Sequence, residues 1–281
     1  NHHAGALPGL IRAALAEAGA GPGDLDAVAF AQGPGLGPCL STGASAARAL
    51  ALTLHRPLVG VNHCVAHLEV GRAVLGCRDP VLLYASGGNT QVIAYAAGRY
   101  RLFGETLDIV VGNMLDKLGR EMGLPFPEVT ELERMALEGG DLLPLPYSVK
   151  GMDVAYSGML TAATQLLARG ASPRDLALSV QETAFAMLVE VTERAMAHVG
   201  RDEVLLGGGV AANSRLREMT EVMARERGAR AYAPPASLCV DNGAMIAVLG
   251  HMMAGAGATT PLEASAVDQR FRTDQVEVTW R

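Results

Sequence analysis

Apolar and polar positions follow one another along this chain in a rhythm that predicts helices and strands in alternation. Apolar residues three and four apart predict an amphipathic helix over 7–18, ended by Gly19 and Gly21. Apolar runs at 26–31 and 57–61 predict buried strands, with a glycine-rich loop at 32–38 and a small-residue helix over 41–54 between them. This order predicts an α/β protein in which helices cover a parallel or mixed sheet.

The second half of the chain predicts a hairpin followed mainly by helices. Apolar runs at 80–85 and 91–95 enclose the small polar turn Ser86–Thr90, which is typical of a β-hairpin. A loop-rich stretch is expected at 139–158 and a buried strand at 202–206. Helices are expected over 113–122, 130–137, 174–199, 211–227 and 241–255.

Composition and charge narrow the class of protein. The 281 residues are 49% hydrophobic and include 33 glycines, which suits two tightly packed domains or one large one. The formal net charge of −6 argues against a strongly basic nucleic-acid binder, although a local patch or a partner can supply positive charge. The four cysteines show no C-x-x-C pair, which predicts reduced thiols in a cytoplasmic protein, and no apolar run predicts a membrane span.

Two histidines at the predicted junction of a strand and a helix are the leading candidates for chemistry. His63 and His67 are four residues apart, so on a helix their imidazoles lie on one face and can share a metal ion with oxygen ligands. Metalloprotease helices have the same spacing but carry a glutamate beside the first histidine, where this chain has Cys64. The pair predicts a metal site without the protease base; the alternative is that the histidines only cap or pack.

Two glycine-rich turns are candidates for nucleotide binding. Ser86–Gly88 lies in the hairpin turn, where glycines let backbone N–H groups approach an anion, although such turns are common without a ligand. Gly207–Gly209 precedes Asn213 in a strand–loop–helix order that suits a phosphate or ribose, but it is not the G-x-G-x-x-G motif of dinucleotide folds.

Two aspartates are candidate site residues, but each also has an ordinary structural explanation. Asp116, beside Lys117 on a predicted helix, is also explained as solvated surface. Asp241 is also explained as the N-cap of the helix over 241–255, but as a metal ligand it would supply the oxygen that the histidines lack.

Six ordered segments resemble the TsaD/OSGEP family, the threonylcarbamoyltransferases of tRNA, and most closely its archaeal KEOPS-type members. The resemblance runs from Asn1 to Arg281. The segments are Gln32-Gly-Pro-Gly-Leu36, Val61-Asn-His-Cys-Val-Ala-His67, Tyr84-Ala-Ser-Gly-Gly-Asn-Thr90, Gly112-Asn-Met-Leu-Asp-Lys117, Gly207-Gly-Gly-Val-Ala-Ala-Asn213 and Cys239-Val-Asp-Asn-Gly-Ala244.

The resemblance implies a fold and a reaction. The implied fold is α/β and actin/hexokinase/Hsp70-like (ASKHA), with two ribonuclease-H-like lobes and the ligand in the cleft. The first lobe is expected over 1–80 and about 247–281, without its N-terminal strands, and the second over 81–246. The implied reaction transfers the threonylcarbamoyl group of threonylcarbamoyl-adenylate to N6 of the adenosine 3′ to the anticodon, in tRNAs that read codons starting with A, and releases AMP. The implied partners are tRNA and KEOPS-type subunits that include a small kinase/ATPase.

The resemblance also implies the site residues. One iron ion per chain, or zinc, is expected to polarise the carbamoyl group, held by four ligands: His63, His67, Tyr84 and Asp241. No protein nucleophile is expected, because the acyl-adenylate is already activated. The adenylate, or ATP or AMP in its place, is expected at Tyr84, Ala85, Ser86, Gly87, Gly88, Asp116, Val129, Glu133 and Asn213.

One departure from the family pattern concerns the nucleotide. Family members usually carry Pro-Gly-Gly-Pro where this chain has Pro127-Glu128-Val129-Thr130, so Val129 replaces a glycine that lies against the nucleotide. This change and the expected lack of the N-terminal strands motivate the alternative of an inactive paralogue or fragment that acts as a scaffold in a KEOPS-like complex. An ATPase or sugar kinase would share the fold alone, and such enzymes lack the His-x-x-x-His pair.

Overall fold

The computed structural model describes residues 2–125 and 127–281. Asn1, at which the family resemblance begins, lies outside the described residues. The chain divides into two compact units, Asn1–Val70 with Asn242–Arg281, and Gly71–Asp241. None of the described helices has the length and apolar character needed to cross a membrane.

The first unit is built around two parallel strands. Phe30 of the first strand lies opposite Gly60 of the second. The helices, strands and short 3-10 turns of this unit are, in chain order, α1 (His2–Glu17), η1 (Pro22–Asp24), β1 (Val28–Gly33), α2 (Gly37–Leu54), β2 (Leu58–Asn62), α3 (His63–Leu75, which continues into the second unit), α10 (Gly243–Gly255), η3 (Leu262–Ala264) and η4 (Thr273–Gln275).

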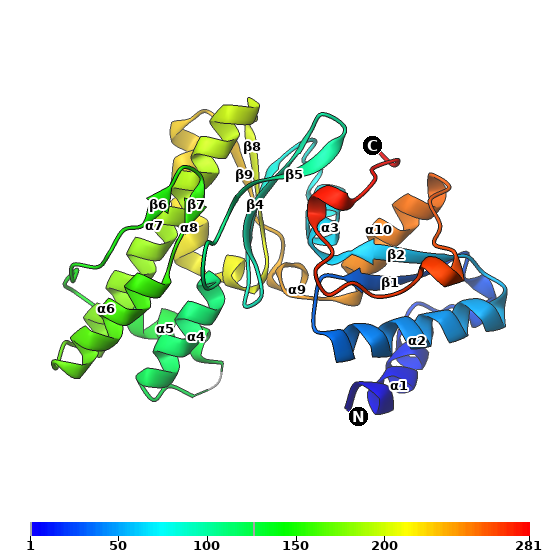
Figure 1. Ribbon diagram of the computed structural model, residues 1–281, viewed down its shortest axis with the longest axis horizontal. Helices are drawn as coiled ribbons and strands as arrows, with labels where there is room; N and C mark the ends of the chain where they lie inside the picture. Colours follow the sequence, from blue (N-terminus) through cyan, green and yellow to red (C-terminus); the bar gives the residue numbers. More distant parts are fainter. Residues whose placement is uncertain (1, 126) are drawn as a thin grey trace. The chain divides into compact units, whose positions relative to one another are not determined.

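Helices α2 and α10 both pack against β1, although nearly two hundred residues of sequence separate them (Figure 1). Small residues make this close packing possible, because Ala44, Ala47 and Ala51 turn one face of α2 into the core beside Phe30. The predicted strands at 26–31 and 57–61 and the predicted helix over 41–54 are confirmed, with α2 starting four residues earlier.

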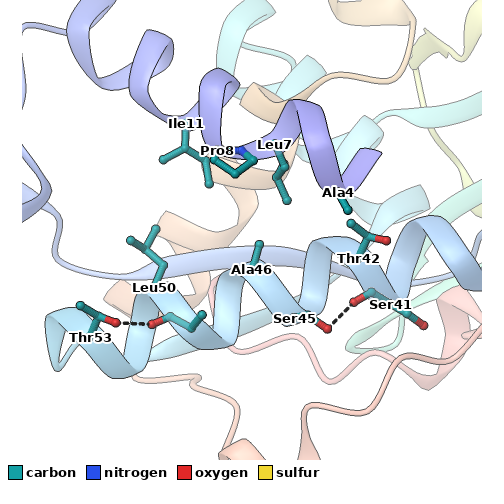
Figure 2. Close-up of a pocket in the computed structure, with 11 residues that line it drawn as sticks. Ala4, Leu7, Pro8, Ile11, Ser41, Thr42, Ser45, Ala46, Leu50 and Thr53 are labelled. Atoms are coloured by element: carbon teal, nitrogen blue, oxygen red, sulfur yellow. Dashed lines mark hydrogen bonds between the residues drawn. The ribbon is translucent and has the colours of Figure 1, made fainter. Parts of the chain in front are cut away.

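An open apolar groove lies between α1 and α2 (Figure 2). Its volume is about 770 Å³, and Leu7 and Ile11 of α1 point into it from one side and Leu50 of α2 from the other. The helix predicted over 7–18 is confirmed and starts earlier, at His2. Among the described residues of α1 none is buried, so its apolar stripe is only partly covered.

The second unit contains a five-stranded mixed sheet in the order β5-β4-β3-β8-β9 (Figure 1). Its elements are β3 (Val81–Ala85), β4 (Thr90–Ala96), β5 (Arg99–Glu105), α4 (Val111–Glu121), α5 (Glu128–Ala136), β6 (Val149–Lys150), β7 (Asp153–Val154), α6 (Ser157–Ala168), α7 (Pro173–Val199), β8 (Glu203–Gly207), η2 (Gly209–Ala212), α8 (Ser214–Glu226), β9 (Arg230–Tyr232) and α9 (Ala236–Cys239).

The sheet has an antiparallel and a parallel side that meet at β3. Strand β3 pairs antiparallel with β4, which confirms the predicted hairpin, and parallel with β8. Every residue of β3 and β8 is buried, as expected for central strands between covered faces. The long helix α7 packs against β3, β4 and β5 and supplies much of the core.

Some elements were missed or misplaced by the sequence prediction. Strand β5 was not predicted, because the exposed arginines at 99 and 101 interrupt its apolar pattern. The stretch 139–158 contains the short strands β6 and β7, and α6 follows it unpredicted. Helix α8 starts at Ser214 rather than 211, because the chain first makes the 3-10 turn Gly209–Ala212.

Candidate functional site

The two histidines lie at the start of α3, directly after β2. Asn62, the last residue of β2, caps this helix, since its Oδ1 accepts hydrogen bonds from the N–H groups of Cys64 (3.0 Å) and Val65 (3.2 Å). The strand-to-helix junction predicted from the sequence is confirmed. Because Asn62 supplies the cap, the alternative of histidines that cap the helix is wrong.

The histidine side chains come together with one carboxylate. The rings of His63 and His67 lie 5.0 Å apart between centroids, and His67 is buried at 2% exposure. One ligand atom each from His63, His67 and Asp241 lie within 4.8 Å of one another. Asp241 directly precedes Asn242 in the chain, at the point where the chain returns to the first unit.

Asp241 does not cap the helix that follows it. The cap of α10 is Asn242, whose Oδ1 accepts the N–H of Met245 at 2.8 Å. The capping alternative for Asp241 is therefore wrong. Two imidazole nitrogens and a carboxylate oxygen form a donor set that fits a borderline cation such as iron or zinc.

Ser86 organises the hairpin turn between β3 and β4. Its Oγ accepts hydrogen bonds from the N–H groups of Gly88 (3.2 Å) and Asn89 (2.9 Å), and its own N–H donates to the Asn89 carbonyl at 2.8 Å. Those two amides are thus used inside the turn rather than offered to an anion. Gly87 and Gly88 are exposed and face open space.

Two glycines from other motifs allow close packing on this turn. A Cβ at Gly112, near the start of α4, would lie 2.6 Å from the Ser86 carbonyl oxygen. Gly208 has φ +91, and a Cβ there would meet the Ala85 carbonyl oxygen, with the ring of Tyr84 at 3.1 Å. Glycines of three separate motifs therefore lie together in the second unit, at the end of β3, where they allow the backbone segments to approach closely.

Asp116 on α4 is a partly buried carboxylate. Burial raises the pKa of Asp116, the nearby carboxylate of Glu128 raises it further, and the Arg120 guanidinium opposes both. Glu128 is itself buried at 7% exposure, with its Oε1 3.5 Å from Arg120 Nε. Val129, next along α5, is half-buried against the core.

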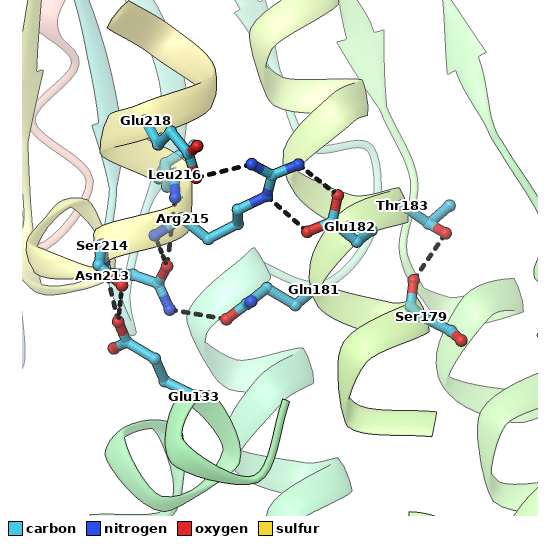
Figure 3. A network of polar contacts seen from close by, with 10 residues as sticks. All are labelled: Glu133, Ser179, Gln181, Glu182, Thr183, Asn213, Ser214, Arg215, Leu216 and Glu218. Carbon is cyan, nitrogen blue, oxygen red and sulfur yellow. Dashed lines mark hydrogen bonds and ion pairs between the residues drawn. The ribbon is translucent and has the colours of Figure 1, made fainter. Parts of the chain in front are cut away.

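Glu133 and Asn213 meet at the start of α8 (Figure 3). Glu133 Oε1 accepts hydrogen bonds from both the N–H (2.8 Å) and the hydroxyl (2.7 Å) of Ser214. Asn213 caps α8, since its Oδ1 accepts the N–H groups of Arg215 (2.9 Å) and Leu216 (3.2 Å).

A buried contact fixes the other end of the Asn213 amide. Its Nδ2 donates to Gln181 Oε1 at 2.9 Å, and both side chains are almost fully buried. Beside it Arg215 pairs with Glu182 and Glu218, which raise the pKa of its guanidinium (Figure 3). Gln181 could not be predicted as a partner of this site, because nothing in its local sequence pattern points to the residue that caps α8.

The sequence of this chain matches a family of known proteins. The family model described as tRNA N6-adenosine threonylcarbamoyltransferase matches residues 1–248. The enzyme of that name from Methanocella arvoryzae is 56% identical over 279 residues, which cover 99% of this chain and 85% of the relative.

A relative with a longer chain and a solved structure add to this comparison. The "probable bifunctional tRNA threonylcarbamoyladenosine biosynthesis protein" of Methanocorpusculum labreanum is 56% identical over 280 residues, which cover 100% of this chain and 53% of the relative. The crystal structure of Thermococcus kodakarensis HypF shares the fold at a TM-score of 0.67 and 15% identity, over 86% of this chain and 42% of that one. The predicted α/β, ASKHA-like fold is confirmed.

Proposed function

This chain belongs to the tRNA N6-adenosine threonylcarbamoyltransferase family and is a transferase, and from that premise we propose how its residues serve the reaction. The donor is threonylcarbamoyl-adenylate, the acceptor is N6 of the adenosine 3′ to the anticodon in tRNAs that read codons starting with A, and AMP leaves. The convergence of His63, His67 and Asp241, with ligand atoms within 4.8 Å of one another, carries the proposal.

His63, His67, Tyr84 and Asp241 would hold one iron ion, with zinc as the second candidate. The fit rests on the donor set, since imidazole nitrogens with carboxylate and phenolate oxygens suit such cations. Bound there, the ion supplies Lewis-acid polarisation of the carbamoyl carbonyl. The imidazoles are pre-positioned, because the Asn62 cap sets the first turn of α3 on which they stand.

The adenylate would lie along the second unit at the end of β3. Gly87 and Gly88 leave open space there, next to Tyr84, Ala85 and Ser86. Asp116 and Glu133 offer carboxylate oxygens to the two ribose hydroxyls. In Glu133 the hydrogen bonds to Ser214 use Oε1, so we assign Oε2 to the ribose.

Two further residues would shape the nucleotide pocket. Asn213 acts through the cap of α8, because it holds Ser214 where Glu133 accepts from it. Val129 is half-buried against the core, and we place its remaining surface against the base. No side chain here is assigned the role of nucleophile, since the donor is already activated.

Partner subunits would supply much of the tRNA contact, because the chain itself carries a formal net charge of −6. We place a KEOPS-type subunit in the apolar groove between α1 and α2 (Figure 2), whose Leu7, Ile11 and Leu50 offer anchors for a partner helix. The bifunctional relative supports an associated protein, such as a small kinase/ATPase, since about half of it lies outside the match. The four cysteines all lie within the described residues and form no disulfide there, which supports a cytoplasmic location.

The scaffold alternative is not favoured. A relative named as a transferase matches 99% of this chain at 56% identity. Glu128 and Val129, two of the residues that motivated the alternative, belong to helix α5, and Val129 packs against the core.

The proposal is tested by measuring the metal content of the protein and its transfer of threonylcarbamoyl to tRNA. Protein purified without a histidine tag is analysed for iron and zinc, and AMP release and labelled threonine on tRNA are then followed with partner subunits present. We expect about one metal ion per chain, lost together with transfer in His63→Ala and retained in the control His251→Ala, which changes an exposed histidine of α10. Full transfer by His63→Ala would overturn the proposal.

A further inference from the structure

We propose that residues 260–281 form a strap that positions helix α3, with Glu69 of that helix as the point where the strap is anchored. This inference rests on the proposed metal site, because its functional consequence is the placement of His63 and His67. Glu69 is a positioning residue, since it lies on the helix and acts through it.

Glu69 is an unusual residue for the interior of a helix. Its side chain has 0% exposure, and a buried carboxylate is costly unless it is paired. Two of its partners are the last two residues of the chain: Trp280 Nε1 donates to Glu69 Oε1 at 3.2 Å, and Arg281 Nε lies 3.5 Å from the same oxygen. The Arg281 side chain is 8% exposed, so the ion pair is shielded from solvent.

The anchor lies away from the histidine face of α3. Residues two apart on a helix project about 200° apart, so Glu69 points away from the direction of His67. A contact with Glu69 therefore fixes the rotation of α3 from the far side without obstructing the imidazoles.

The strap holds α3 at a second point. Asn62, which caps the first turn, donates through Nδ2 to the carbonyl of Phe271 at 3.1 Å. The start of α3 and a point nearly two turns further on are both tied to the same segment. A helix held at both points cannot rotate or shift without breaking one of them.

The rest of the segment is tied to the strands beneath. The N–H of Thr260 donates to Leu58 at 2.7 Å, and the N–H of Asp268 donates to the Gln32 carbonyl at 2.9 Å. Gln32 Nε2 also donates to the carbonyls of Ala264 (3.0 Å) and Ala266 (2.9 Å). The strap thus connects α3 to β1 and β2, which gives it a rigid base.

The inference predicts that breaking the anchor loosens the metal site before it unfolds the protein. The probe is Co²⁺ alone, added to the metal-free chain of 281 residues, with affinity and the visible d–d spectrum as readouts. Glu69→Gln, Trp280→Phe and Arg281→Ala should each weaken Co²⁺ binding about tenfold, near the lower end for groups that orient metal ligands. Arg281→Lys should restore most of the affinity, because it keeps the charge.

Matched controls come from the same segment. Arg270→Ala and Glu277→Gln change exposed side chains of like chemistry and should bind Co²⁺ as the unmutated chain does. The double variant of Glu69→Gln with Arg281→Ala should bind Co²⁺ no more weakly than the more affected of the two single variants. Both substitutions remove the same Glu69–Arg281 ion pair, so their effects should not add.

The outcomes separate this inference from the metal-site proposal. If the unmutated chain binds Co²⁺ and the folded anchor variants bind it equally well, the strap has a structural role alone and the inference is overturned. If Glu69→Gln fails to fold, Trp280→Phe and Arg281→Ala decide, because they leave the carboxylate in place. If the unmutated chain binds no Co²⁺, the metal-site proposal fails and the inference fails with it.

Discussion

The close approach of Gly208 to the end of β3 yields a sharp prediction. Gly208 follows β8 with φ +91, and an added Cβ would meet the Ala85 carbonyl oxygen and lie 2.7 Å from its carbon. Gly208→Ala therefore carries two costs, one for a positive-φ backbone (φ +91, ψ 161) that residues with a Cβ rarely adopt and one for overlap with a neighbouring strand.

The two costs can be separated by a matched substitution. Gly228 also has positive φ (+67), but a Cβ there would face open space. Gly228→Ala should cost about 1 kcal/mol for the backbone alone. Gly208→Ala should cost about 3 kcal/mol, because forced displacement of packed atoms adds about 2 kcal/mol.

Hydrogen exchange of the amides in β3 and β8 measures this difference locally. A further 2 kcal/mol corresponds to about 30-fold faster exchange where opening is the limiting equilibrium. We also expect AMP to bind Gly208→Ala more weakly than Gly228→Ala in calorimetry, since the displaced peptide lies beside Ser86. Equal exchange rates in the two variants would refute the close approach.

Three further predictions concern the nucleotide side. Gly87→Ala should leave the urea midpoint unchanged, because a Cβ there meets nothing within 4 Å, yet weaken AMP binding in calorimetry; unchanged binding would remove the turn from the site. Asn213→Ala should cost about 2–3 kcal/mol in urea unfolding, because it removes a cap and leaves Gln181 unpaired, whereas Ser172→Ala, which removes the cap of α7, should cost only about 1 kcal/mol; equal losses would contradict the buried pair. The folded-state pKa of Asp116 is raised above its ordinary value of 3.8, so the folded state binds more protons there and stability falls as pH rises from that value through the raised pKa. Asp116→Asn should remove this part of the pH dependence of the urea midpoint, and an unchanged profile would contradict it.

The sequence predicted features that depend on neighbouring residues in the chain. The local pattern predicts a strand followed by a helix, so the common face of His63 and His67 could be predicted from their spacing. The hairpin around Ser86 could be predicted in the same way, because turn residues and apolar runs are local signals. Strand β5 and helix α6 were not predicted, because their own apolar patterns are weak and their burial depends on the elements that pack on them.

Tertiary structure decided which distant residues meet. Asp241 reaches the histidines only because the chain returns to its first unit there, and sequence alone left its role open between ligand and cap. The Glu133–Ser214 bond joins residues 81 apart, and Trp280–Glu69 joins residues 211 apart. Local propensity carries no information about such pairs, because they form only where packing of the whole unit brings separate elements together. The chain by itself determined the family, the chemical types and the helix face; the folded structure determined which polar groups are buried and must therefore be paired.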